Sequence, residues 1–84
     1  MRDELARLST IPTSSSRQIH GRRVVRQLQF ISVDNHTSQE EAEIEFRRQV
    51  SRVGGNGVIN MAIRRHRGGY ISIQGDAVKL GVIV

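Results

Sequence analysis

One stretch decides how this chain folds: Gly54-Gly55-Asn56-Gly57-Val58-Ile59-Asn60-Met61. A segment with helical periodicity precedes the two leading glycines, and an apolar run typical of a strand begins at Val58. Glycine just past the last turn of a helix adopts a positive φ without steric cost and so satisfies the free carbonyl groups. This stretch therefore predicts a turn that joins a helix to a strand, made by Gly54, Gly55, Asn56 and Gly57.

The segment before this turn is predicted to be a helix over residues 38–53. Its apolar side chains recur at spacings of four, four and three residues, which places Ala42, Phe46, Val50 and Val53 in one stripe. Thr37 with Glu40, or Ser38 with Glu41, fits the capping box, in which a hydroxyl and a carboxylate satisfy free backbone amides. Acidic residues gather in the first half of the segment, where they complement the helix dipole.

Strands are predicted on both sides of this helix. Residues 22–33 read as a strand with apolar side chains on both faces: Val24, Leu28 and Phe30 on one, and Val25, Ile31 and Val33 on the other. Residues 58–65 and 70–80 form a hairpin around Gly68-Gly69. A helix crossover makes the first two strands parallel. We therefore expect a small α/β (α+β) domain of β-α-β-β order, with a three-stranded mixed sheet and one covering helix.

At 84 residues the chain holds one small domain, which we place at residues 17–84. In residues 1–16, Leu5 and Leu8 share one face of a short helical turn, but Pro12 and the serines at 14–16 end that pattern. The first 16 residues are therefore expected to form a flexible or loosely docked segment.

The uncovered face of the sheet is predicted to be an oligomer interface. One helix covers one face, and the other face carries an apolar set: Val25, Ile31, Val33, Val58 and Ala62. Large exposed apolar patches usually mark interfaces. A chain of this size without cysteine has neither a large core nor disulfides to stabilise it. Self-association to a homo-oligomer is therefore the strongest expectation that the residues support.

The turn stretch resembles the Gly-Ala-Asn-Ala-Val-Ile signature of the YbjQ-like family, sometimes labelled heavy-metal-binding domains. Residues 21–33 look like the first strand of that family and residues 70–78 like its last, so the resemblance covers about residues 20–80. Glycine replaces alanine at positions 55 and 57, and the connection from the first strand to the helix is shorter than in the family. The resemblance implies a small α/β fold that assembles into rings, with pentamers as the family's form, and no established activity.

No cofactor, metal or catalytic group is predicted. A second small family, the dodecins, shares the strand–helix–strand–strand order and binds flavin through a stacking tryptophan, which this chain lacks. The residues available as metal ligands include no thiol and have no recognisable ligand spacing: His20, His36, His66, Asp34 and Asp76. Neither a Ser-His-Asp order nor the H-E-x-x-H spacing occurs. We therefore expect a protein that is not an enzyme.

The charge balance supports a different kind of partner. The net charge is +5, from 12 arginines and one lysine against eight acids. Such an excess permits binding to nucleic acid or another polyanion, for which the candidate contacts are Arg22, Arg23, Arg26, Arg64, Arg65 and Arg67. A solvated hairpin end that protects a sheet edge explains the hairpin arginines equally well.

The sequence therefore supports two alternative functions. The first is a non-enzymatic, ring-forming module with a structural or ligand-binding role that is not established. The alternative is a basic module that binds nucleic acid or another polyanion. The sequence contains no apolar run of the ~20 residues that a membrane span needs, and no signal-peptide core follows the N-terminus, so a cytoplasmic protein without membrane contact is expected.

Overall fold

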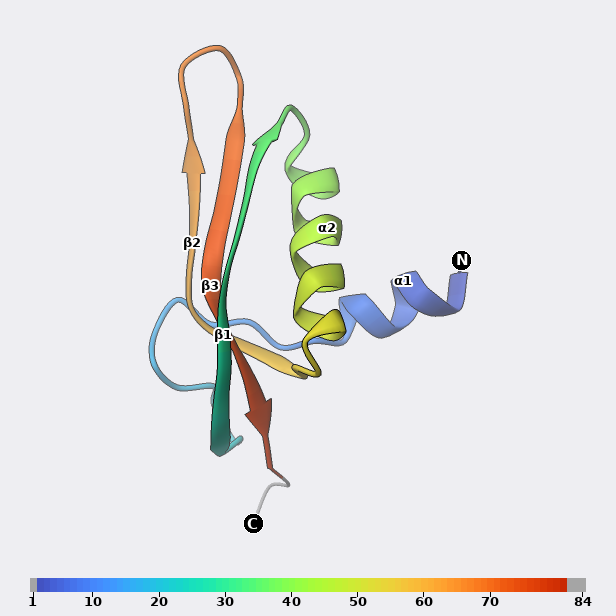
Figure 1. The fold of residues 1–84 in the computed structure, drawn as a ribbon, viewed down its shortest axis with the longest axis vertical. Coiled ribbons are helices and arrows are strands. Elements are labelled where there is room, and N and C mark those ends of the chain that lie inside the picture. The colour runs from blue at the N-terminus through green and yellow to red at the C-terminus, as the bar shows by residue number, and fades with distance from the viewer. Residues whose placement is uncertain (1, 82–84) are drawn as a thin grey trace.

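The computed structural model describes residues 2–81 (Figure 1). Two helices and three strands follow one another along the chain: α1 (Arg2–Ser9), β1 (Val24–His36), α2 (Gln39–Arg52), β2 (Gly57–Arg65) and β3 (Ile71–Leu80). In Figure 1, α2 lies along one side of the sheet, α1 packs near the C-terminal end of α2, and the β2–β3 hairpin extends beyond the end of β1. The structure is thus a small α+β domain with a three-stranded sheet, and α1 is an additional element.

The sheet is antiparallel, not mixed as predicted. Its strand order is β1-β3-β2, and β3 pairs antiparallel with both neighbours. Because α2 connects them by a crossover, β1 and β2 run in the same direction. They are not neighbours, however, since a gap as wide as one strand separates them. The hairpin then folds β3 back into that space. The prediction failed because it assumed that strands joined by a crossover are also neighbours.

The helix α2 matches the prediction most closely. Ser38 is its N-cap, and the Ser38 side chain accepts a hydrogen bond from the backbone amide of Glu41 at 3.4 Å. The structure thereby selects the second of the two predicted caps. Ala42, Phe46 and Val50 are fully buried, as the apolar stripe predicted. They pack on β1 and β3 within a core whose buried members are Leu8, Ile11, Ile31, Val33, Ala42, Phe46, Val50, Val58, Ile71, Ile73 and Ala77.

The face of the sheet that α2 covers is the opposite of the predicted one. Ile31, Val33 and Val58, expected on an exposed interface, are 3%, 4% and 0% exposed and lie in the core under the helix. Irregularities in register between Gln27 and Gln29, and between Ile59 and Ala62, interrupt the alternation of side chains on the two edge strands. A bulge shifts the alternation of side chains by one residue. A prediction that assigns every second residue to one face therefore places the residues beyond the bulge on the wrong face.

The turn 54–57 works as predicted. Gly54 has φ +84°, and the Gly55 amide donates to the carbonyl oxygen of Val50 at 2.9 Å, which ends α2. Asn56 then ties the start of β2 to the end of β3, because its side chain accepts from the Leu80 amide at 2.6 Å and donates to the Leu80 carbonyl oxygen at 3.3 Å. A Cβ at Gly57 would lie 2.5 Å from Leu80 Cδ1, so that position has no room for a side chain.

Residues 2–19 contribute to the fold directly. Leu8 and Ile11 are 3% and 9% exposed and belong to the core. The Arg47 Nη1 donates to the carbonyl oxygens of both residues, at 2.9 and 2.6 Å, and so joins α2 to the end of α1. Further along, Ile19 enters a second cluster on the other face of the sheet, with Ile59, Val78 and Leu80. The loop before β1 thus covers the lower part of the face that α2 leaves open.

Candidate functional surfaces

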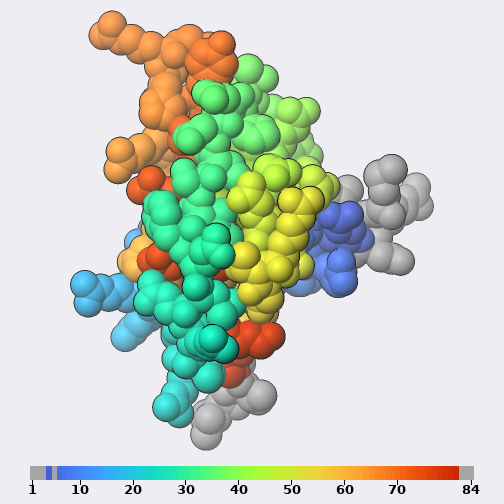
Figure 2. Space-filling view, in the orientation of Figure 1, coloured from blue at the N-terminus to red at the C-terminus, as the bar shows by residue number. Residues whose placement is uncertain are grey.

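The outer edge of β1 is the most exposed apolar feature of the molecule. β1 is 13 residues long and lies at one side of the sheet, and within residues 2–81 no strand pairs with its outer edge. Two of its apolar side chains are exposed, Val25 at 62% and Phe30 at 57%. Figure 2 shows β1, in teal and green, at the surface along most of the length of the molecule.

The other edge of the sheet is partly covered. Residues 12–16 run beside β2 and form an isolated parallel bridge between Thr13 and Val58. The Val58 amide donates to the Pro12 carbonyl oxygen at 3.0 Å, and the Ser14 amide donates to the Val58 carbonyl oxygen at 2.9 Å. The amides of Asn60 and Met61 donate to this segment as well. The edge strands β1 and β2 therefore differ: the first is open and the second is occupied over much of its length.

The open face of the sheet is mainly polar, not the apolar patch that the sequence predicted. The register pairs Ser32 with Gln74 and Arg64 with Ser72 across the strands. Asp76 accepts a hydrogen bond from the Asn60 side chain at 3.1 Å on the same side. Of the five predicted interface residues, only Val25 is exposed, and Ala62 is half-buried. The two most exposed large apolar side chains of the described residues, Val25 and Phe30, lie instead on the edge strand β1.

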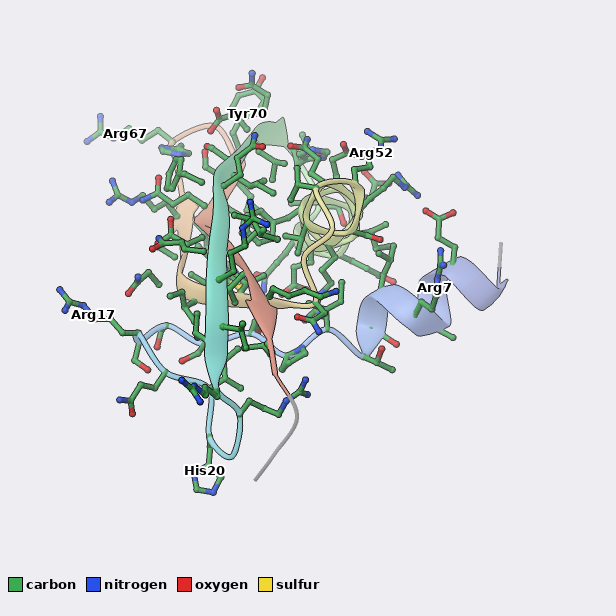
Figure 3. All side chains as sticks on the ribbon, turned by 60° about the horizontal axis from the view of Figure 1, so that its bottom comes forward. Arg7, Arg17, His20, Arg52, Arg67 and Tyr70 are labelled. Carbon is green, nitrogen blue, oxygen red and sulfur yellow. The ribbon has the colours of Figure 1, made fainter. Side chains whose placement is uncertain are left out.

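The predicted basic residues fall into two groups at opposite ends of the sheet. Arg22, Arg23 and Arg26 lie at the start of β1, near the end of β3, because the register joins Arg26 to Lys79. Arg64, Arg65 and Arg67 lie at the other end, around the turn between β2 and β3, where Figure 3 shows Arg67 beside Tyr70. One copy of the chain does not bring the six arginines into one patch.

The hairpin end has local bonds of its own. The two predicted turn glycines, Gly68 and Gly69, have φ +87° and +83°, and the His66 amide donates to the Tyr70 carbonyl oxygen at 2.7 Å. The His66 ring and the Ser72 hydroxyl are 2.7 Å apart. Arg65 donates to the Gln39 side chain at 2.5 Å and so joins the hairpin to the start of α2. These contacts are consistent with a structural role for this end.

The sequence did not reveal a groove where the C-terminal ends of α1 and α2 meet. Arg7 and Arg22 line one part of it, together with Ser51 and Asn56. Arg7 also lines an adjoining part with Arg52. Figure 3 shows Arg7 and Arg52 extending from neighbouring helix ends. The only indication of this groove in the sequence is that Arg7 and Arg52 stand in the last turns of two helices. They become neighbours only because α1 packs against α2.

Arg48 forms the ion pairs of the described side chains, and it lines this groove together with Glu4. The Arg48 Nε is 2.9 Å from Glu4 Oε1, and the Arg48 Nη1 is 3.2 Å from Glu45 Oε2. The hydrogen bond from Arg48 and its positive charge lower the pKa of Glu4 below its ordinary value of 4.5. The hydrogen bond from Gln49, followed by that from Arg48, lowers the pKa of Glu45 in the same direction. The bond between Arg48 and Glu4 joins α2 to α1, whereas the bonds of Glu45 lie within α2.

Acidification is expected to destabilise this contact between the helices. Because the folded protein lowers both carboxyl pKa values, the unfolded chain takes up protons first. The stabilisation is present above pH 4.5 and is lost as the pH falls through the lower folded values. Urea midpoints of the wild type between about pH 7 and pH 3 should fall more steeply than those of a Glu4→Gln/Glu45→Gln variant. Glu40→Gln, at a position that takes part in neither ion pair, is the control, and equal slopes for all three proteins would contradict the assignment.

Two features are absent from the described residues 2–81. No group of three or more His, Asp or Glu side chains in this part of the chain could hold a metal ion. Neither α1 nor α2 has the length and apolarity that a membrane crossing requires. The comparisons with known proteins yield no matching family model and no matching curated relative.

Proposed function

We propose that this protein is a non-enzymatic structural or ligand-binding module that assembles with a second copy of itself through the outer edge of β1. The observation that carries the proposal is the length and composition of this edge: 13 residues, with Val25 and Phe30 exposed. The two sheets would join into one continuous antiparallel sheet across a two-fold axis.

An open edge strand of this kind favours pairing. Its free amide and carbonyl groups can pair with any other strand, and proteins usually protect edges with charges, prolines or short strands. Residues 27–33 of β1 contain neither a charged residue nor a proline. The stretch is therefore unprotected, which suits a strand whose partner is a second chain.

The charges of β1 favour antiparallel pairing about its centre. The strand is basic at its start, with Arg26 after Arg22 and Arg23, and acidic near its end, at Asp34. Antiparallel pairing about Phe30 sets the basic end of one copy beside the acidic end of the other, whereas parallel pairing sets like charges together. It also brings the two Phe30 rings to the axis, where they bury each other.

A ring built from sheet edges is a weaker proposal. Such a ring needs a head-to-tail contact, in which β1 of one copy pairs with β2 of the next. Residues 12–16 already occupy the outer edge of β2 around Val58. The structure therefore supports a two-fold dimer as the basic unit.

Substituting Phe30 by lysine is expected to convert the dimer to a monomer. Two lysines would face each other across the axis, and like charges directly opposite each other destabilise a strand pair. The fold should persist, because Phe30 is 57% exposed. The measurement is the mass of the native protein at concentrations from about 1 to about 100 μM, at low and high salt.

Tyr70→Lys is the matched control for this substitution. Tyr70 is 47% exposed and lies at the hairpin end, next to Ile71, which pairs with the last residue of β1, whereas Phe30 pairs with Asp76 further along the sheet. The wild type and Tyr70→Lys should both be dimers, and high salt should not separate them, because backbone pairing and apolar burial are not screened. A monomeric wild type at the highest concentration, or an unchanged mass for Phe30→Lys, would refute the proposal.

A further inference from the structure

The groove between the C-terminal ends of α1 and α2 points to a second role. We infer that it binds the phosphate groups of a nucleic-acid strand, through Arg7, Arg22 and Arg52. This inference does not depend on the dimer, since the groove lies on the helices and on the loop before β1.

Three different parts of the chain supply the arginines. Arg7 comes from α1, Arg52 from α2, and Arg22 from the loop that leads into β1. Arg7 and Arg22 line the same hollow, and the hollow that contains Arg7 and Arg52 adjoins it, with Leu8 and Ser51 common to both. The two hollows together therefore hold Arg7, Arg22 and Arg52 beside the Glu4–Arg48 ion pair, and a guanidinium group can bind phosphate oxygens with two parallel hydrogen bonds.

Among the described side chains, none of these three arginines forms an ion pair within 4.0 Å, although the charges of Arg7 and Arg52 add to the lowering of the pKa of Glu4 and of Glu45. The ion pairs formed there all involve Arg48. Arg22 donates from its Nε to the Gly81 carbonyl oxygen at 3.2 Å, which orients the guanidinium without neutralising its charge. Arg7 and Arg52 are exposed. Positive charge therefore remains available to a ligand.

Arginines in the last turn of a helix often serve to bind the free carbonyl groups, but other donors already fill that role here. At the end of α1, the Leu8 and Ile11 carbonyl oxygens accept from Arg47, and the Arg7 carbonyl oxygen accepts from Thr10. At the end of α2, the amides of residues 53–55 donate to the carbonyl oxygens of residues 49–51. Hydrogen bonding to these carbonyl groups therefore does not account for Arg7 and Arg52, which line one hollow.

The surroundings of the groove favour a polymer over a single small anion. The sequence contains no acid in residues 17–33 or 46–75. Next to the groove, the start of β1 and the end of β3 add Arg23, Arg26 and Lys79, all of them exposed, and the last two stand directly opposite each other as like charges. One small anion cannot reach all of these cations, whereas a strand with a phosphate at every residue can. A concave site between two helix ends also suits a strand better than a flat membrane surface.

The test compares two double variants that remove the same charge from opposite ends of the molecule. Arg22→Gln/Arg52→Gln removes two groove cations, and Arg64→Gln/Arg67→Gln removes two hairpin cations. Fluorescence anisotropy with a labelled 20-nucleotide DNA, single-stranded and duplex, gives the affinity of each protein from about 50 to about 200 mM salt. Circular dichroism melts establish that both variants are folded.

The groove variant should lose about tenfold or more in affinity, and the slope of log affinity against log salt should flatten by about 1 to 2, one unit for each lost phosphate contact. The hairpin variant should change either quantity much less. Phe30→Lys should bind like the wild type at equal chain concentration. Equal losses in the two double variants, a larger loss at the hairpin, or no binding of either DNA by the wild type would overturn the inference. Binding to vesicles of anionic lipid without binding to DNA would overturn it as well.

Discussion

Replacing Phe46 by alanine is expected to lower the free energy of unfolding by about 4 kcal/mol, close to the whole stability of a small domain. Phe46 is the largest fully buried side chain among the described residues. It lies at the centre of α2, in the layer between that helix and the strands β1 and β3. Its removal leaves a cavity that the neighbouring β-branched residues cannot fill without leaving their rotamers. Urea unfolding followed by far-UV circular dichroism measures the loss.

Phe30→Ala is the matched control, because it removes the same atoms from a side chain that is 57% exposed. At protein concentrations low enough to keep the chain monomeric, its cost should be below about 1 kcal/mol. A similar loss for the two substitutions would show that α2 does not cover the sheet in the way described.

The second large effect is expected at the N-terminal segment. The double substitution Leu8→Ala/Ile11→Ala should lower the free energy of unfolding by about 4 kcal/mol, because two nearly buried side chains leave the core together. Their carbonyl oxygens would still accept from Arg47, but the apolar contact that seats α1 would be gone. Urea unfolding at neutral pH again provides the measurement.

This measurement shows whether the N-terminal segment contributes to the stability of the fold or is only loosely attached to it. Ile63→Ala serves as the control, because Ile63 is 39% exposed at the far end of β2, and its cost should be well below that of the double variant. If the double variant unfolded at the same urea concentration as the wild type, residues 2–16 would add nothing to the stability of the domain. The groove lined by Arg7 would then lose its support as well.

Local signals in the sequence predicted the elements well. The capping residues before α2, the glycines after it and the glycine pair in the hairpin each act through bonds with near neighbours. Such signals survive any arrangement of the sheet, because they depend on the backbone of a few residues.

The arrangement of the strands was harder to predict, because β1 is apolar on both faces and bulged. β3 alternates cleanly over residues 71–77, with Ile71 and Ile73 buried under α2 and the polar Ser72 and Gln74 on the other side. β3 is also the central strand, so its alternation, and not that of β1, decides which face the helix covers. Val33 pairs with Ile73 and Ile31 with Gly75, so both β1 residues lie on the face that α2 covers.

The contacts that the N-terminal segment makes with the rest of the domain could not be predicted from local sequence patterns. Leu8, Ile11 and Ile19 are isolated apolar residues in a polar stretch, and each is buried by residues far along the chain. The groove arginines depend on the same docking. Residues that become neighbours only through tertiary packing leave no periodic signal in the sequence.

The position of β3 has a consequence for how the chain acquires its structure during synthesis. The strand that holds the sheet together comes after both of the strands it joins, so neither β1 nor β2 has its partner while the ribosome is still translating residues 71–80. The helix α2 can form early, since its contacts are local, but the sheet must wait. During that interval β1 exposes two unpaired edges instead of one, and nascent chains on neighbouring ribosomes can meet through it.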